Sequence, residues 1–569
     1  MKAEFRWPAL VALVGVALVA TLLFWPERRE ETPTPVPEAE LLSGPGHCTA
    51  ETVVPGGIFV EGVVGIPQRL NPLLSDGNPV EADLVDLLFD GLTRYDDRGL
   101  LRPALAESWV VSDDGLTITF ALREEAAWHD GQPVRAADVQ FTYGLLQQEA
   151  FPAPAGLRLL WQAVTMVVVD ERTVQFRLPQ PYAPFLEATT RGLLPAHLLA
   201  DIPPAELADH PYNWAPVGTG PFMVADGDNW RRTGRLTLKP NPVYWPPEIS
   251  PDGLAFQFFA DYPNLLAALD ARDIQAVNKI PAAAVVEAAL LPNLRLISSP
   301  APRYTQLLFN LSDGPARAQA VRQALAYGLD RYQLRATALA GQGLPLEGPY
   351  LSTSWGYNPA DLTVHTPDPG VARSLLDGAG WPLVEGSPVR QREEAELRLR
   401  LIFVAEPGAR ALAQEMARQW AEIGVGISST PLSPPAFLEA LAGREFDLAL
   451  VEVDPPGDPD LYDFWSQEAM IRGQNYAGWN NRRASEALEA ARQLYELAER
   501  RPYYDAFLRF FNTDLPALTL YQHVYTYGLS TAVQNADIGP VLYPRDRYQT
   551  LADWRWQQRL VNVPCPGEG

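Results

Sequence analysis

The chain has 569 residues, of which 47% are hydrophobic, 20% charged and 10% aromatic. This is the composition of a globular protein, and its length predicts three or four structural units rather than a single small module. With 69 acidic against 45 basic residues, the net charge is −24, which argues against nucleic acid as a partner. The two cysteines are too few for a disulfide scaffold or a four-cysteine zinc site.

An uncharged and almost wholly apolar segment spans residues 8–25. A helix of this length rises about 27 Å, which nearly crosses a bilayer core of roughly 30 Å. Lys2 and Arg6 precede it and favour a cytoplasmic N-terminus, although basic residues on the far side weaken this bias. We therefore predict that residues 1–29 form a cytoplasmic start and a transmembrane anchor. A cleaved signal peptide is the alternative interpretation.

A polar segment with regularly spaced prolines occupies residues 30–50 and is expected to form an extended stalk. The globular part would then lie on the outer face of the cytoplasmic membrane, or be periplasmic or extracellular if the N-terminus is cleaved. Thiols oxidise there. A disulfide between Cys48 and Cys565 would tie the two ends together and add about 5 kcal/mol in the chain-entropy picture. Two free cysteines are the alternative.

Short alternating apolar runs dominate residues 57–260. The runs at 118–122, 173–178 and 235–238 predict strands in a mixed, strand-rich region.

The later part of the chain changes to an alternation of strands and helices. The predicted segments, starting and ending with a strand, are 397–404, 409–423, 425–427, 435–442 and 446–451. This order is typical of βαβ units in a largely parallel sheet. Ligands bind beyond the carboxyl ends of such strands, which indicates residues 405–408 and 453–460.

Groups for catalysis or metal binding are scarce. The six histidines are scattered without the spacing of metal ligands, and neither a nucleophile elbow nor a phosphate-binding glycine loop occurs. We therefore expect no catalytic residue, no metal and no cofactor. Carboxylates cluster once, at residues 452–463, at the end of a predicted strand. A secreted carboxylate-dependent hydrolase is thus the enzyme alternative.

Several short stretches occur in the order of a known family pattern. They are 57–60, 70–73, 88–92, 101–109, 112–117, 122–123, 128–133, 137–139, 218–222, 241–245, 308–310, 321–327, 330–331 and 379–381. Together they resemble the family 5 extracytoplasmic solute-binding proteins, which are the dipeptide-, oligopeptide- and nickel-binding receptors of ABC importers. The likeness extends from residue 57 to about residue 530.

The resemblance implies an α/β fold, a two-lobed periplasmic-binding-protein-like clamp of type II, cluster C, with an extra subdomain. The implied boundaries are 51–300 for lobe I with an inserted subdomain at about 90–210, 301–518 for lobe II, and 519–569 for the return to lobe I. Connections near 301–304 and 517–521 would form the hinge. With both chain ends in lobe I, the Cys48 to Cys565 bridge is favoured further.

The implied function is capture of a solute, foremost a peptide, between the lobes and its delivery to ABC permease subunits, without an enzymatic step. A ligand sensor for a membrane signalling partner is a further alternative.

The resemblance also suggests ligand-binding residues. In peptide receptors of this family an aspartate before the Asp-Pro of lobe II binds the ligand's amino group, and Asp454 stands nearest to that position. An arginine that would clamp a carboxylate is absent from the end of the 397–404 strand. The candidates are Gly65, Ile66, Pro67, Tyr304, Asp454, Asp458, Asn475, Tyr476 and Trp479. Core packing is the alternative interpretation for all of them except the two aspartates. A longer peptide held by backbone hydrogen bonds and a neutral ligand such as an oligosaccharide are alternative ligands.

Overall fold

A computed structural model describes most of the chain after the N-terminal segment. The described residues are 47–54, 57–96, 98–245, 252–538, 544–548 and 550–564, without the side chains of 47–54 and 557–564. The predicted anchor, Cys565 and the Cys48 side chain therefore lie outside the described residues. Among the helices that are described, none is both long and apolar enough to span a membrane.

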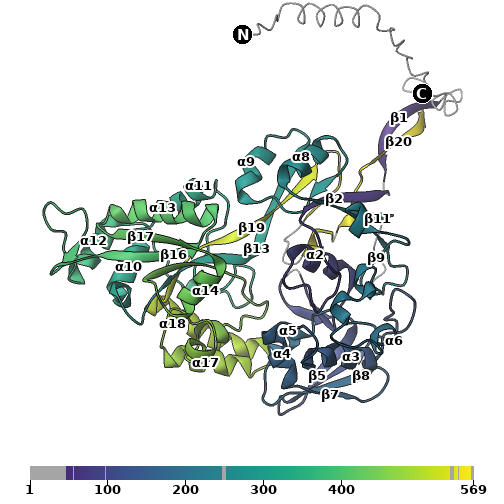
Figure 1. The fold of residues 1–569 in the computed structure, drawn as a ribbon, viewed down its shortest axis with the longest axis horizontal. Helices are drawn as coiled ribbons and strands as arrows, with labels where there is room; N and C mark the ends of the chain where they lie inside the picture. Colours follow the sequence, from purple (N-terminus) through teal and green to yellow (C-terminus); the bar gives the residue numbers. More distant parts are fainter. Residues whose placement is uncertain are drawn as a thin grey trace, which may run out of the picture. The chain divides into compact units, whose positions relative to one another are not determined.

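The described residues fall into two units. In one, β1 (His47–Val54) pairs with β20 (Gln557–Pro564) in a two-stranded sheet. The other unit, residues 55–557, carries the remaining elements and is built on a ten-stranded sheet of order β17-β16-β18-β13-β19-β12-β2-β11-β10-β9 (Figure 1).

Two long antiparallel strands occupy the middle of this sheet. β13 (Leu294–Phe309) and β19 (Ala517–Ser530) pair along most of their length, with register shifts between Pro300 and Tyr304 and at Thr305. Figure 1 shows them side by side. Among the described strands, these two join the two sides of the sheet through backbone pairing.

On one side of the two central strands lies the predicted βαβ pattern. β16 (Arg398–Val404) is parallel to both β17 (Gly426–Leu432) and β18 (Leu448–Val453), with α13 (Pro407–Ala421) and α14 (Pro434–Ala442) as connections. Proline within the first turn suits both helices, and α13 buries one apolar face that includes Met416 and Trp420. The predicted strands, helices and parallel pairing are confirmed, with small shifts of their ends.

On the other side, β2 (Ile58–Val64) is parallel to β11 (Gly253–Phe259) and β12 (Ala276–Val277), whereas β10 (Arg235–Pro240) and β9 (Phe222–Val224) continue the sheet antiparallel. A separate four-stranded antiparallel sheet comprises β5 (Ala106–Val111), β6 (Thr117–Leu122), β8 (Thr173–Arg177) and β7 (Thr165–Val168). Alternate residues of β6 are buried, as a half-buried strand requires. The three predicted strands of this region are confirmed.

The other short strands are β3 (Thr93–Tyr95), β4 (Leu101–Pro103), β14 (Gln391–Arg392) and β15 (Ala395–Glu396). The other helices are α2 (Pro79–Leu88), α3 (Ala136–Gln147), α4 (Ala155–Gln162), α5 (Phe185–Ala188), α6 (Ala196–Leu199), α7 (Trp230–Thr233), α8 (Tyr262–Asp270), α9 (Val285–Ala288), α10 (Gln319–Tyr327), α11 (Arg331–Ala338), α12 (Pro369–Gly378), α15 (Tyr462–Trp465), α16 (Ala469–Arg472), α17 (Arg482–Arg492) and α18 (Leu497–Asp514).

The buried apolar residues form separate cores. Residues from 59–276 share one core with residues from 527–554, and residues from 60–294 form a second core. Residues 304–521 supply three other clusters. The chain therefore crosses between the two sets of cores along β13 and again along β19.

Candidate functional site

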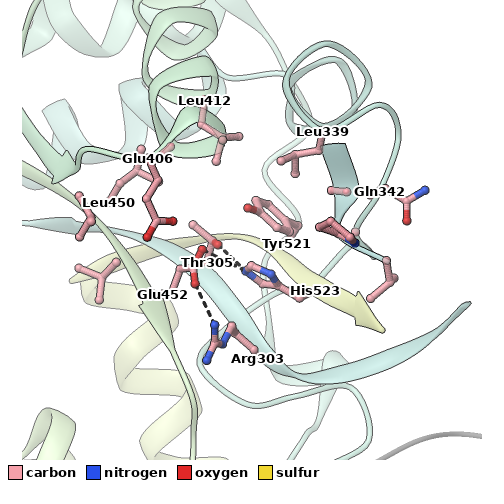
Figure 2. Close-up of a pocket in the computed structure, with 18 of the residues that line it drawn as sticks. Arg303, Thr305, Leu339, Gln342, Glu406, Leu412, Leu450, Glu452, Tyr521 and His523 are labelled. Carbon is pink, nitrogen blue, oxygen red and sulfur yellow. Dashed lines mark hydrogen bonds and ion pairs between the residues drawn. The ribbon is translucent and has the colours of Figure 1, made fainter. Parts of the chain in front are cut away.

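A cavity of about 640 Å³ lies at the carboxyl ends of β16 and β18, beside the middle of β13 and β19 (Figure 2). Further parts of its lining come from the start of α13, from residues 437–441 of α14, from the loop 339–343 after α11, from residues 279–282 after β12, and from Gln474 and Tyr476. This is the edge at which ligands bind in parallel sheets, and it includes residues of the predicted 405–408 segment.

Aliphatic and aromatic side chains form much of the wall. Leu412 comes from α13, Phe437 and Leu441 from α14, Leu450 from β18 and Leu339 from the loop after α11. These side chains can enclose the apolar part of a ligand and exclude water from it.

Arg303 organises the charged part of the cavity. Its Nε and Nη2 donate to the two carboxylate oxygens of Asp454 over 2.6 and 2.7 Å, and its Nη1 donates to Glu452 over 3.2 Å. The hydrogen bonds to Asp454 raise the pKa of Arg303 above its ordinary value. Burial raises the pKa of Glu452, and the charges of Glu406 and Asp454 add to this, while Arg303 opposes it.

Lys279 and Glu406 also line the cavity. Burial lowers the pKa of Lys279, and the nearby Arg303 lowers it further. Figure 2 shows the Glu406 carboxylate on the same side of the cavity as Glu452. Neither Lys279 nor Glu406 forms an ion pair with another described residue. Beside the paired Arg303 and Glu452, the described lining therefore offers the Lys279 ammonium group and the Glu406 carboxylate to a ligand.

His523 is a neutral member of the lining. Its Nε2 lies 2.8 Å from Thr305 Oγ1 on the neighbouring strand. Burial, together with the positive charges of Arg303 and Lys279, lowers the pKa of His523 to about 4. At neutral pH the imidazole can thus exchange hydrogen bonds with a ligand without adding a charge.

Two of the predicted ligand-binding residues lie at this cavity. Tyr476 lines the cavity. Asp454 directly follows β18 and accepts hydrogen bonds from Arg303, which lines the cavity. Tyr304 precedes Thr305 and lies on the opposite face of β13, where it is buried against Leu346 and Val453.

Three other candidates hold the structure around the cavity. The buried Asp458 carboxylate accepts from both terminal nitrogens of Arg500 over 2.6 Å each. Asn475 bridges its own loop, because its amide donates to the carbonyl of Trp479 over 2.8 Å and accepts from the Trp479 N–H over 3.0 Å. The buried Trp479 indole donates to Asp514 over 2.8 Å.

The three candidates in the loop after β2 lie apart from the cavity. Gly65 has a φ of 112°, a conformation that favours glycine, and its N–H donates to the carbonyl of Phe259 over 2.9 Å. Ile66 and Pro67 line a different hollow of about 400 Å³, beside Trp214.

Sequence reasoning did not name Lys279, Arg303 or His523 as ligand-facing residues. It indicated Glu406 and Glu452 only through the 405–408 segment and the 452–463 carboxylate cluster. A signal existed for three of these five residues, because Glu406 and Glu452 lie at predicted strand ends and Arg303 lies in the predicted hinge. Lys279 follows a two-residue strand that carries no pattern of its own.

The comparisons with known proteins agree with this geometry. Residues 101–470, more than half of the chain, match the family described as bacterial extracellular solute-binding proteins, family 5 Middle. The chain belongs to the family 5 bacterial extracellular solute-binding proteins. Among curated family 5 relatives, the oligopeptide-binding protein AppA of Bacillus subtilis (strain 168) is 25% identical over 476 residues, which cover 82% of this chain and 86% of AppA.

A second family 5 relative, the dipeptide-binding protein of Escherichia coli (strain K12), is 26% identical over 485 residues, or 80% of this chain and 87% of that protein. Among solved structures, the ABC transporter substrate-binding protein CtaP of Listeria monocytogenes superposes with a TM-score of 0.74 at 21% identity, covering 88% of this chain and 99% of CtaP. The DppA of Helicobacter pylori in complex with the peptide STSA gives a TM-score of 0.65 at 21% identity, with 88% and 98% coverage. These likenesses establish the periplasmic-binding-protein-like α/β fold.

Membership in family 5 makes this chain a substrate-binding receptor of the ABC-importer type, and not an enzyme. Proteins of this family act outside the cytoplasm. The predicted family and class of function are confirmed.

Proposed function

We propose that this receptor captures a short peptide in the cavity at the ends of β16 and β18, by closure of two lobes, and presents it to the permease of an ABC importer. The observation that carries the proposal is a cavity whose apolar walls surround unpaired charges of both signs.

A peptide matches this lining in three respects. Its ammonium group complements Glu406, its carboxylate complements Lys279, and its side chains fit the apolar walls. The cavity volume of about 640 Å³ falls within the range of about 300–1,000 Å³ that is usual for small-ligand sites. The printed names of relatives support the same ligand class, because AppA is an oligopeptide-binding protein and the Escherichia coli relative a dipeptide-binding protein.

Asp454, beside the cavity, is proposed as a second acceptor for the ligand's amino group, in addition to Glu406. Arg303 occupies both carboxylate oxygens of Asp454, so an ammonium group would share Asp454 with Arg303. Tyr476 would contact the peptide from the loop beside α14, where it lines the cavity.

The proposed lobes are 51–300 with 519–569, and 301–518. The separate cores, which divide near residues 294–304 and 521–527, support these boundaries. A ligand that touches both lobes favours the closed form by its extra affinity for that form. The permease would then recognise the closed form.

Attachment to the outer face of the membrane through residues 8–25 and the 30–50 stalk belongs to this proposal. Membrane fractionation of the native host, with and without carbonate extraction, tests it. The pairing of β1 with β20 supports the proposed bridge between Cys48 and Cys565, which mass spectrometry without reduction would detect.

Calorimetric titration with di- to pentapeptides tests the proposed ligand class. Free peptides should bind, and acetylation or amidation of a peptide's ends should weaken binding about tenfold or more, since an unpaired charge in a binding site costs about 2–5 kcal/mol. Lys279→Met and Glu406→Gln should each abolish discrimination against one of the two blocked ends. Glu422→Gln, at the exposed C-cap of α13 and outside the cavity, is the matched control. Equal affinity for free and blocked peptides would contradict the proposal.

A further inference from the structure

A second contact joins distant parts of the chain outside the cavity. Glu187, on the single-turn helix α5, accepts the Gly457 N–H at Oε1 over 2.7 Å and the Asp458 N–H at Oε2 over 3.2 Å. Both amides belong to the loop after β18, which also carries Asp454. One carboxylate of the 90–210 segment therefore binds the backbone of the loop that borders the cavity.

The loop is fitted closely to this carboxylate. A Cβ atom added to Gly457 would lie 2.5 Å from the Tyr95 ring, and the Tyr95 hydroxyl hydrogen-bonds Glu187. Asp458, in turn, is fixed to Arg500 of α18. Only a glycine lets the loop backbone come this near to Tyr95.

A third set of contacts supports the same interface. The Ala183 N–H donates to the carbonyl of Arg492 over 2.7 Å, and the Arg492 guanidinium lies over the Tyr182 ring. The Tyr495 hydroxyl, beyond the end of α17, donates to the carbonyl of Gly115 over 2.9 Å. The turn between β5 and β6 and the loop after β8 thus contact the end of α17 and its connection to α18.

We propose that Glu187 is a positioning residue that latches the closed form, and that it sets the residence time of the ligand without touching it. Opening the cleft separates residues 90–210 from the 454–460 loop, so both backbone N–H groups lose their acceptor. The inference rests on the proposed closure of two lobes. It adds a determinant of release that lies outside the ligand cavity.

Two variants weaken the latch from opposite sides. Glu187→Ala removes the acceptor, and Gly457→Ala pushes the loop away from Tyr95. Each should raise the dissociation rate of a bound peptide about tenfold with a smaller change in the association rate. The double variant should dissociate no faster than the more affected single variant, because both changes act on one contact. Glu206→Ala, an exposed residue of the same segment, is the control.

Hydrogen exchange of the loop amides in peptide-saturated protein, where the closed form predominates, tests the contact directly. Between residues 455 and 460, prolines at 455, 456 and 459 leave N–H groups only on Gly457, Asp458 and Asp460. A peptide from this loop should exchange faster in Glu187→Ala and Gly457→Ala than in the wild type and in Glu206→Ala.

Unchanged exchange in both variants would overturn the latch itself. Faster exchange with an unchanged peptide dissociation rate would overturn its role in ligand release. If no peptide binds the wild type, the proposed function fails; exchange in ligand-free protein that is nevertheless faster in both variants than in the wild type would then show that the contact forms without a ligand. Faster exchange together with faster dissociation in both variants, and neither in the control, is the expected result.

Discussion

Replacing Asp458 by asparagine should lower the stability of the protein even when no ligand is present. Both carboxylate oxygens of Asp458 accept from Arg500 over 2.6 Å, and both side chains are almost fully buried, at 6% and 3% exposed. Arg500 is also held by the Tyr504 hydroxyl over 2.6 Å and the carbonyl of Ala491 over 3.1 Å. It therefore cannot leave its site to regain water.

The expected loss follows from the charge that remains. Removing one partner of a buried ion pair typically costs about 3–5 kcal/mol, since the other charge stays buried without compensation. The unfolding entropy of about 2.1 cal/mol/K per residue amounts to about 1 kcal/mol/K for roughly 500 residues. The melting temperature should therefore fall by about 3–5 °C.

Scanning calorimetry and urea unfolding of ligand-free protein measure this change. Asp463→Asn is the matched control, because the Asp463 side chain is 72% exposed and lies 3.9 Å from Arg492; it should leave the melting temperature within about 1 °C. An Asp458→Asn protein of wild-type stability that has lost peptide affinity would refute the reasoning. That result would make Asp458 a direct ligand contact instead.

Further predictions concern other buried groups. Arg547→Met should lower the urea midpoint by the equivalent of about 3–5 kcal/mol, because Arg547 donates to both Glu61 and Asp83 in the core; an unchanged midpoint would contradict this. Burial and the neighbouring Asp458 raise the pKa of Glu187 from its ordinary value of 4.5 to about 7. The free energy that this raised pKa contributes to folding is therefore fully present below pH 4.5 and is lost as the pH rises through 7. A wild-type melting temperature that falls between pH 5 and 8, with a shallower slope in Glu187→Ala, is expected. Leu441→Ala, at a buried wall position, should cost about 2–5 kcal/mol and weaken peptide binding in calorimetry.

Hydrophobic periodicity in the sequence predicted those strands and helices whose pattern lies within a short stretch of the chain. The strand at 398–404, the helix that begins at Pro407 and the strand that ends at Val453 each show their periodicity within about 15 residues. Because their order requires parallel pairing, the edge that carries Glu406 and Glu452 followed from the sequence as well.

The contacts that complete the cavity and the latch could not be predicted in this way. Glu187 and Gly457 are separated by 270 residues, and Lys279 reaches the cavity only because β12 pairs with β19. Such contacts depend on the tertiary fold, to which hydrophobic periodicity gives no access. Trp479 was predicted to bind ligand but is buried. An aromatic residue after an acidic loop fits either a ligand site or a core, and only its contacts in the folded protein distinguish the two.

Small-angle X-ray scattering of the purified protein during titration with a bound peptide tests the central claim most directly. Capture by closure predicts that the radius of gyration falls as the peptide saturates the protein, and that mass spectrometry of the same sample recovers the peptide intact. A radius of gyration that does not change at saturation, or a peptide that is cleaved, would contradict the account.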